Sequence, residues 1–420
     1  MDGLAVVVLT LISILASVFW YSSIFKKSKE GTAPYPPGPW GLPVLGYLPF
    51  LHVNLHHQFT ELAKKYGPIY KLQLGSKLCM VISSPALIKE VVRDQDTIFA
   101  NRDPPVAAIV ATGGLDIFWG PTGLTGEEVA KVLRDVSKKI GKPIEIGELV
   151  FLTELNVILS LLWGGTIDAE TRDRLGAEFR DKVSKLVDLL GKPNVSDFFS
   201  VLAKFDVQGI EKEMRAVVPG VEEILDSVID ERMKMVVAEG GESSAKRGKD
   251  LLGILLELKE QEVGEGSSFG LTQIKAILMD IVVGGTDTTA TIVEWVMAEL
   301  LHNPDIMKSR EGNLPPTPST PTPRPQVWEN PSEFRPDRFL NNTGNLDYMG
   351  NNVQYLPFGS GRRVCPGLPL AEKMVMYLLA TLLHSFEWRL PEGETVDLSE
   401  KFGIVMRKKT PLLAIPYRRF

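Results

Sequence analysis

Hydrophobic and polar positions in this chain repeat mostly with the period of an α-helix, and only short stretches show the two-residue period of a strand. Glycine, proline or asparagine closes several of the helical stretches. The pattern therefore predicts a mainly α protein with a minor β part. We expect helices over residues 55–66, 85–93, 151–163, 169–190, 207–237, 271–301 and 368–386, and strands over 69–74, 77–82, 386–390 and 412–416.

The N-terminus departs from this pattern. Residues 4–25 carry no charge, and a helix of that length would span about 33 Å, enough to cross the apolar core of a bilayer. Lysines follow at positions 26, 27 and 29, and the positive-inside rule then places the rest of the chain in the cytosol. We expect residues 1–25 to be a retained transmembrane signal anchor. A cleaved signal peptide is the alternative, disfavoured by the long apolar run and by Asp2 ahead of it.

Residues 26–49 are rich first in lysine and then in proline, which predicts a semi-rigid hinge. Residues 50–420 follow as the main domain, long enough to bury a large core. A net charge of −6 gives no reason to expect a nucleic-acid partner. Only two cysteines occur and no Cys-x-x-Cys pair, so the chain has neither a disulfide framework nor a zinc-finger pattern.

One of the two cysteines, Cys365, lies in a glycine-rich stretch that runs from Phe358 to Gly367. The glycines permit tight turns and let the backbone approach a flat ligand closely. Arg362 and Arg363 place fixed positive charge beside the thiol, where it can stabilise a thiolate or bind a carboxylate. A thiolate on such a loop suits the axial coordination of haem iron, and a structural cysteine in a turn is the alternative.

A second unusual stretch, residues 283–290, lies in the middle of the longest predicted helix. Gly284 and Gly285 each weaken a helix by about 1 kcal/mol relative to alanine, so we expect a local widening with room for a small ligand such as dioxygen. Asp287 and Thr288 follow, and a carboxylate beside a hydroxyl suits proton delivery. A plain helix kink is the alternative. A second membrane span is not expected, because acidic residues interrupt the apolar run.

These two stretches resemble the motifs of the cytochrome P-450 family. The cysteine loop is similar to its haem-binding signature, and the central helix is similar to its oxygen-activation motif. The matching residues are Phe358, Gly361, Arg363, Cys365 and Gly367 in the loop, and Gly284, Gly285, Asp287 and Thr288 in the helix. The resemblance implies the cytochrome P-450 fold and a haem b bound between the two stretches.

The resemblance also implies roles for individual residues. Cys365 would bind the haem iron, and Arg363 would hold a haem propionate. Asp287 and Thr288 would deliver protons while oxygen is activated. The implied activity is that of a monooxygenase, which inserts one oxygen atom from O2 into a lipophilic small molecule. Electrons would come from NADPH through a membrane-bound NADPH–cytochrome reductase, which a basic surface containing Lys373 could meet.

Beyond these motifs, the sequence as a whole most resembles plant-type microsomal members of the family. That similarity implies a terpenoid or phenolic substrate, a role in secondary metabolism, and a single-pass anchor in the endoplasmic reticulum membrane. The catalytic domain would then face the cytosol.

Two elements that the family uses to hold its haem are missing from the sequence. No tryptophan is followed four positions later by arginine, so the expected Trp-x-x-x-Arg is not found near Trp119. A Pro-rich irregular segment, residues 311–325, stands where a Glu-x-x-Arg helix is expected, which would leave Arg338 without its partners. We therefore expect an incomplete fold with internal deletions. A truncated, non-catalytic, membrane-anchored member that binds haem weakly or not at all is the alternative function.

Overall fold

The computed structural model describes residue 13 and residues 35–99, 126–163, 169–238, 251–261, 269–309, 330, 333–336, 339, 348–350 and 352–419. Apart from residue 13, the predicted anchor at residues 4–25 lies outside the described residues. The same holds for Trp119, for Arg338 and for the Pro-rich segment 311–325.

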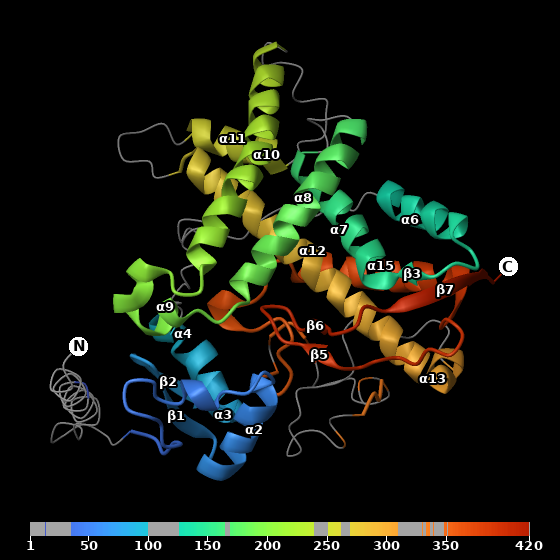
Figure 1. The fold of residues 1–420 in the computed structure, drawn as a ribbon. Coiled ribbons are helices and arrows are strands. Elements are labelled where there is room, and N and C mark those ends of the chain that lie inside the picture. The colour runs from blue at the N-terminus through green and yellow to red at the C-terminus, as the bar shows by residue number, and fades with distance from the viewer. Residues whose placement is uncertain are drawn as a thin grey trace, which may run out of the picture.

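Two long apolar helices, α7 (Ile146–Trp163) and α12 (Leu271–His302), pack against each other at the centre of the core (Figure 1). Both are long and apolar enough to cross a membrane, but 61% of each apolar window is buried inside the protein. Their apolar character is therefore explained by burial in the core of a globular domain.

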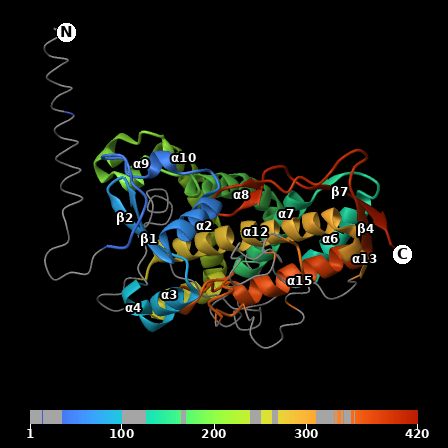
Figure 2. The same cartoon turned by 90° about the horizontal axis from the view of Figure 1, so that it is seen from below.

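Further helices surround this central pair. α6 (Gly126–Lys138), α8 (Ala169–Leu190) and α11 (Leu251–Gln261) pack on α7, and α10 (Ile210–Ala238) packs on α8. On the other side, α15 (Leu368–Ser385) packs against α12, and Figure 2 shows the two helices running next to each other. Buried leucine, isoleucine and valine side chains from these helices form one continuous hydrophobic cluster.

The described residues form three small antiparallel sheets. β1 (Ile69–Leu74) and β2 (Lys77–Ile82) make a hairpin in which Leu74 pairs with Lys77, which leaves a two-residue turn. β7 (Leu413–Arg418) pairs with β4 (Phe386–Arg389) on one side and with β3 (Ile144–Glu145) on the other. β5 (Glu400–Lys401) and β6 (Arg407–Lys408) form the third sheet.

The first hairpin belongs to a small N-terminal lobe with its own hydrophobic cluster. α2 (Leu55–Tyr66) packs on β1, and Leu62, Tyr70, Leu72 and Leu74 are buried between them. Figure 1 shows this lobe in blue, at the opposite end of the molecule from β4 and β7. The remaining elements are short: η1 (Leu48–Phe50), α3 (Pro85–Lys89), η2 (Glu90–Asp94), α4 (Asp96–Phe99), α9 (Val195–Phe198), η3 (Ser200–Phe205), α13 (Pro304–Ser309) and η5 (Gly361–Arg363).

The mainly helical architecture with small sheets is confirmed, and two details of the prediction are wrong. The helix expected over 85–93 is helical over that range, α-helical to Lys89 and then π-helical in η2. α7 begins at Ile146 rather than 151, and Gly147 in its first turn hid this start in the sequence. A methyl group there would lie 2.9 Å from Glu294 Oε2, so glycine leaves room for the Glu294 carboxylate of α12. Finally, α12 is α-helical throughout, without the widening expected at Gly284 and Gly285.

Candidate functional site

The cysteine loop is shaped by backbone hydrogen bonds and by glycines with positive φ. The Cys365 amide donates to the Phe358 carbonyl over 2.8 Å, which closes the loop. Gly359 and Gly361 have φ angles of 75° and 63°, a region that favours glycine. Gly361 opens the short helix η5, and Gly367 is the N-cap of α15. The loop therefore holds Cys365 just ahead of a helix that packs on α12.

The thiol itself is half-buried and forms no disulfide. A methyl group added at Gly367 would lie 3.8 Å from the Cys365 sulfur, which is an ordinary van der Waals contact. The φ angle of Gly367 is −77°, so its backbone is not strained either. Neither packing nor conformation requires glycine at this position. Glycine does leave the sulfur uncovered on that side, as a flat ligand over the loop would need, so the loop fits a haem bound through Cys365.

Three side chains that the sequence analysis missed support the loop. The Ser360 hydroxyl is buried and donates to the Gly350 carbonyl over 2.7 Å. Tyr348, whose ring lies 6.3 Å from that of Phe358, donates to Glu372 on α15. Burial and the Glu372 carboxylate raise the pKa of Tyr348 to about 12, so the phenol stays a hydrogen-bond donor at neutral pH. The only sequence signal for them is their closeness to the cysteine loop.

The two arginines of the loop, Arg362 and Arg363, are exposed in η5. η5 packs against η2 and α4, so this side of the loop faces the end of the N-terminal lobe. Both guanidinium groups therefore place positive charge at the protein surface beside the loop.

On the central helix, Thr288 is exposed although most of α12 around it is buried. Its hydroxyl donates to the Gly284 carbonyl one turn earlier, over 2.6 Å. The neighbouring Thr286 makes the same type of bond to Val282, but its side chain is fully buried. Within the described residues, α12 therefore has an open face at Gly284 and Thr288 on which a small ligand could bind.

The packing of the two core helices explains the glycine at position 285. A methyl group there would lie 2.8 Å from Cδ1 of Ile158 on α7, closer than side chains approach in folded proteins. This glycine allows the two core helices to pack closely. Its predicted role beside a cofactor stays a prediction, because the contact with Ile158 already explains why this position is glycine.

Asp287 points away from the open face. Its carboxylate is buried and accepts a hydrogen bond from Nε of Arg407 on β6 over 3.1 Å, and Nη2 of the same arginine forms an ion pair with it at 2.8 Å. Arg407 also reaches Asp188 on α8, with 3.1 Å between Nη1 and Oδ1. Burial raises the pKa of Asp287, and the bonds with Arg407 oppose that shift. Asp287 and Thr288 are adjacent in sequence, but they bond to different groups on different sides of α12.

Asp287 and Arg407 line a polar cavity of about 420 Å³ between α7, α12 and the β5–β6 hairpin. Glu294 also borders this cavity and accepts a hydrogen bond from the Leu412 amide over 2.8 Å. Burial raises the pKa of Glu294, while its backbone hydrogen bond lowers it. Two carboxyl groups of α12 whose pKa values are raised by burial therefore line the same cavity.

The structure is a helical domain in which an uncovered thiol lies ahead of one helix. That helix packs on a central helix with an open threonine face. This is the architecture and donor set of a haem-thiolate protein. The comparison with known families gives the same class. The chain belongs to the cytochrome P450 family, whose model matches residues 36–119, 123–311 and 319–415.

Several relatives of the chain are plant proteins named for an activity. The chain is 28% identical to a carnosic acid synthase of Salvia pomifera, over 98% of this chain and 99% of the relative. It is 30% identical to a geraniol 8-hydroxylase of Catharanthus roseus, over 99% of each. It is 29% identical to a flavonoid 3'-monooxygenase of Crocosmia x crocosmiiflora, over 97% of each.

The match to the family is not continuous along the chain. The family match is interrupted at 120–122 and at 312–318, next to Trp119 and inside the Pro-rich segment. The alignment with the Salvia pomifera protein spans 506 positions, more than the 420 residues of this chain. Some residues of the relative therefore have no counterpart here, as the predicted internal deletions require.

Proposed function

We propose that this chain is a haem-dependent monooxygenase that inserts one oxygen atom from O2 into a lipophilic small molecule. The observation that carries the proposal is the uncovered Cys365 thiol on a loop closed by Phe358 and shaped by Gly359 and Gly361. Membership of the cytochrome P450 monooxygenase family supports it. When bound, a thiolate-ligated haem supplies the redox chemistry that cleaves the O–O bond.

The residues of the chain would bind the cofactor and move protons. Cys365 is the iron ligand, Phe358, Gly361 and Gly367 shape its loop, and Arg363 would pair with a propionate. Thr288, exposed on α12, would hold a water molecule or donate a proton from the open face. Asp287 would serve as the proton reservoir behind it, because burial raises its pKa.

In the resting geometry Asp287 is bonded to Arg407 and not to Thr288. Proton delivery from Asp287 to the open face therefore requires its carboxylate to leave Arg407 or to act through water. The polar cavity beside Asp287 would supply that water.

The substrate class that the relatives favour is a terpenoid or a phenolic compound. One relative is named for geraniol, one for carnosic acid and one for flavonoids. Electrons would come from NADPH through a reductase, and the exposed Arg362 and Arg363 beside Cys365 offer a basic surface for an acidic partner. Residues 4–25 would anchor the chain in the endoplasmic reticulum membrane.

A second candidate function is a truncated, non-catalytic, membrane-anchored family member. The two interruptions of the family match favour it, because they fall where two haem-holding elements are expected. In that case Cys365 would keep its loop but bind haem weakly or not at all.

Turnover separates the two candidates. Microsomes that contain the chain and an NADPH–cytochrome reductase would be incubated with NADPH, ¹⁸O2 and a panel of terpenoids and flavonoids. A monooxygenase yields a product that carries one ¹⁸O atom and depends on NADPH. The Thr288→Ala variant should still consume NADPH but form less product. No labelled product from the panel, together with no haem in the purified chain, would establish the non-catalytic candidate.

A further inference from the structure

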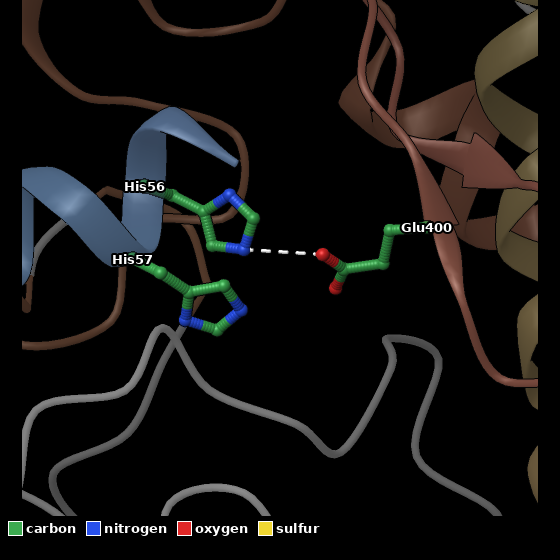
Figure 3. Close-up of side chains that lie close together, drawn as sticks. All are labelled: His56, His57 and Glu400. Atoms are coloured by element: carbon green, nitrogen blue, oxygen red, sulfur yellow. Dashed lines mark ion pairs between the residues drawn. The ribbon is translucent and has the colours of Figure 1, made fainter. Parts of the chain in front are cut away.

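A cluster of potential metal ligands lies away from the cysteine loop, between the N-terminal lobe and the β5–β6 hairpin. His56 and His57 are in the first turn of α2, and Glu400 belongs to β5. One ligand atom from each of the three lies within 4.8 Å of the other two. Figure 3 shows both imidazole rings on the side of α2 that faces the Glu400 carboxylate.

This convergence is unusual for neighbouring residues of a helix. Consecutive helical side chains point about 100° apart and do not normally face one group. Here the ring centroids of His56 and His57 are only 4.0 Å apart, with 40° between the ring planes.

The contact between His56 and Glu400 has the dimensions of a metal site. His56 Nε2 lies 3.2 Å from Glu400 Oε2. Ligand atoms that are each about 2.0–2.1 Å from a tetrahedral zinc ion lie about 3.3 Å from one another. An ion could therefore enter between these two atoms with little movement of either side chain.

The His56 ring makes its polar contact through Nε2, to the Glu400 carboxylate. Its Nδ1 atom is buried and has no hydrogen-bond partner among the described residues, so Glu400 alone orients the ring.

We propose that His56, His57 and Glu400 bind a divalent metal ion of the zinc class. Two imidazole nitrogens and one carboxylate oxygen are a ligand set that Zn²⁺ accepts, with water in the fourth position. His57 is exposed, so its ring can turn to complete the site. The ion would join the N-terminal lobe to the hairpin whose Arg407 bonds with Asp287.

The simpler alternative is an ion pair between His56 and Glu400, in which His57 takes no part. Zinc binding distinguishes the two, and it does not depend on haem or on the proposed activity. The full chain would be purified in detergent without a polyhistidine tag, treated with a chelator and titrated with ZnCl2. Calorimetry and thermal unfolding would be recorded for the parent, for His57→Ala and for Glu400→Gln, and His384→Ala on α15 would serve as the matched control.

The proposal predicts saturable binding of Zn²⁺ and a rise in Tm with zinc concentration. His57→Ala and Glu400→Gln should each weaken that binding roughly tenfold or more, and His384→Ala should leave it unchanged. Circular dichroism without zinc would show whether each variant is folded. Equal zinc affinity in the parent and in folded His57→Ala would overturn the proposal, as would the absence of saturable binding. Zinc held elsewhere, for example by Cys365, would persist in both site variants.

Discussion

Asp287 and Cys365 are the two reactive side chains on which the proposed function depends, and the protein surrounds them differently. Asp287 is buried, forms a hydrogen bond and an ion pair with Arg407, and lies in a helix that the core encloses. Cys365 is half-buried on a loop, and glycine leaves its sulfur uncovered on one side. Residues of the chain itself satisfy the Asp287 carboxylate, whereas the Cys365 thiol is left with space for a ligand. The loss of elements elsewhere in the chain should therefore weaken the thiol site more than the site of Asp287.

The largest effect on stability is expected from the loss of Arg407. Arg407→Ala would leave a buried carboxylate without its partner, and we expect it to lower the free energy of unfolding by about 2–3 kcal/mol. The estimate is at the low end for a buried pair because a quarter of the Arg407 side chain is exposed. Urea unfolding measures the change.

The matched control for Arg407→Ala is an arginine in an exposed pair. Arg215 bonds Glu211 one helical turn away, and 65% of its side chain is exposed. Arg215→Ala should cost only about 0.3–0.5 kcal/mol. Equal losses from the two variants would mean that the chain does not depend on Arg407 to hold Asp287.

The packing of the two core helices is the next test. Gly285→Val places branched carbon where the structure leaves only 2.8 Å to Ile158 Cδ1, and we expect a loss of about 1–3 kcal/mol. Ile158→Val removes that methyl group and should restore part of the loss in the double variant. A double-mutant cycle in urea gives the coupling between the two positions. Additive losses would contradict a direct contact.

A further effect, smaller for each pH unit than the losses above, should appear in the pH dependence of stability. Glu154 on α7 is almost fully buried, and burial raises its pKa well above the ordinary value of 4.5. The folded state therefore binds this proton more tightly than the unfolded state, so stability falls as the pH rises from 4.5 towards the raised pKa. The slope from this group is at most about 1.4 kcal/mol per pH unit.

Glu154→Gln removes the titration and keeps the shape of the side chain. The parent should lose stability more steeply than this variant between pH 5 and pH 8, as measured by urea unfolding at several pH values. Parallel curves for the two proteins would show that Glu154 does not titrate in this range.

The smallest change in stability is expected at Thr288. Thr288→Ala removes an exposed hydroxyl that bonds only to the Gly284 carbonyl among the described residues, and alanine favours a helix more than threonine does. We expect a change of about 0.5 kcal/mol or less. If Thr288 serves the open face, the same variant should release more hydrogen peroxide per NADPH consumed. A large loss of stability would show instead that Thr288 belongs to the structural core.

Local patterns predicted the helices and strands well, because each depends on residues close together in sequence. The hairpin over 69–82 and the long helix from Leu271 follow from alternation, periodicity and turn residues. The partner of Asp287 could not be predicted, because Arg407 lies 120 positions away in a two-residue strand. The cluster of His56, His57 and Glu400 was missed for the same reason.

The sequence predicted only the parts of the candidate site that belong to a motif. The sequence identified the cysteine loop and the Gly284–Thr288 stretch, but two adjacent residues can face different sides of one helix, about 100° apart. Asp287 and Thr288 do so, and this divergence depends on packing against β6 and α8 rather than on the motif. Gly285 likewise has a packing reason that its motif did not suggest.

The central claim is that Cys365 of this chain holds a haem despite the missing elements. Its most direct test is the carbon monoxide difference spectrum of the reduced full-length protein in microsomes. We predict the red-shifted Soret band of a thiolate-ligated haem in the parent and in Cys79→Ser, and its loss in Cys365→Ser. Absence of the band from folded parent protein, or its persistence in Cys365→Ser, would contradict the claim.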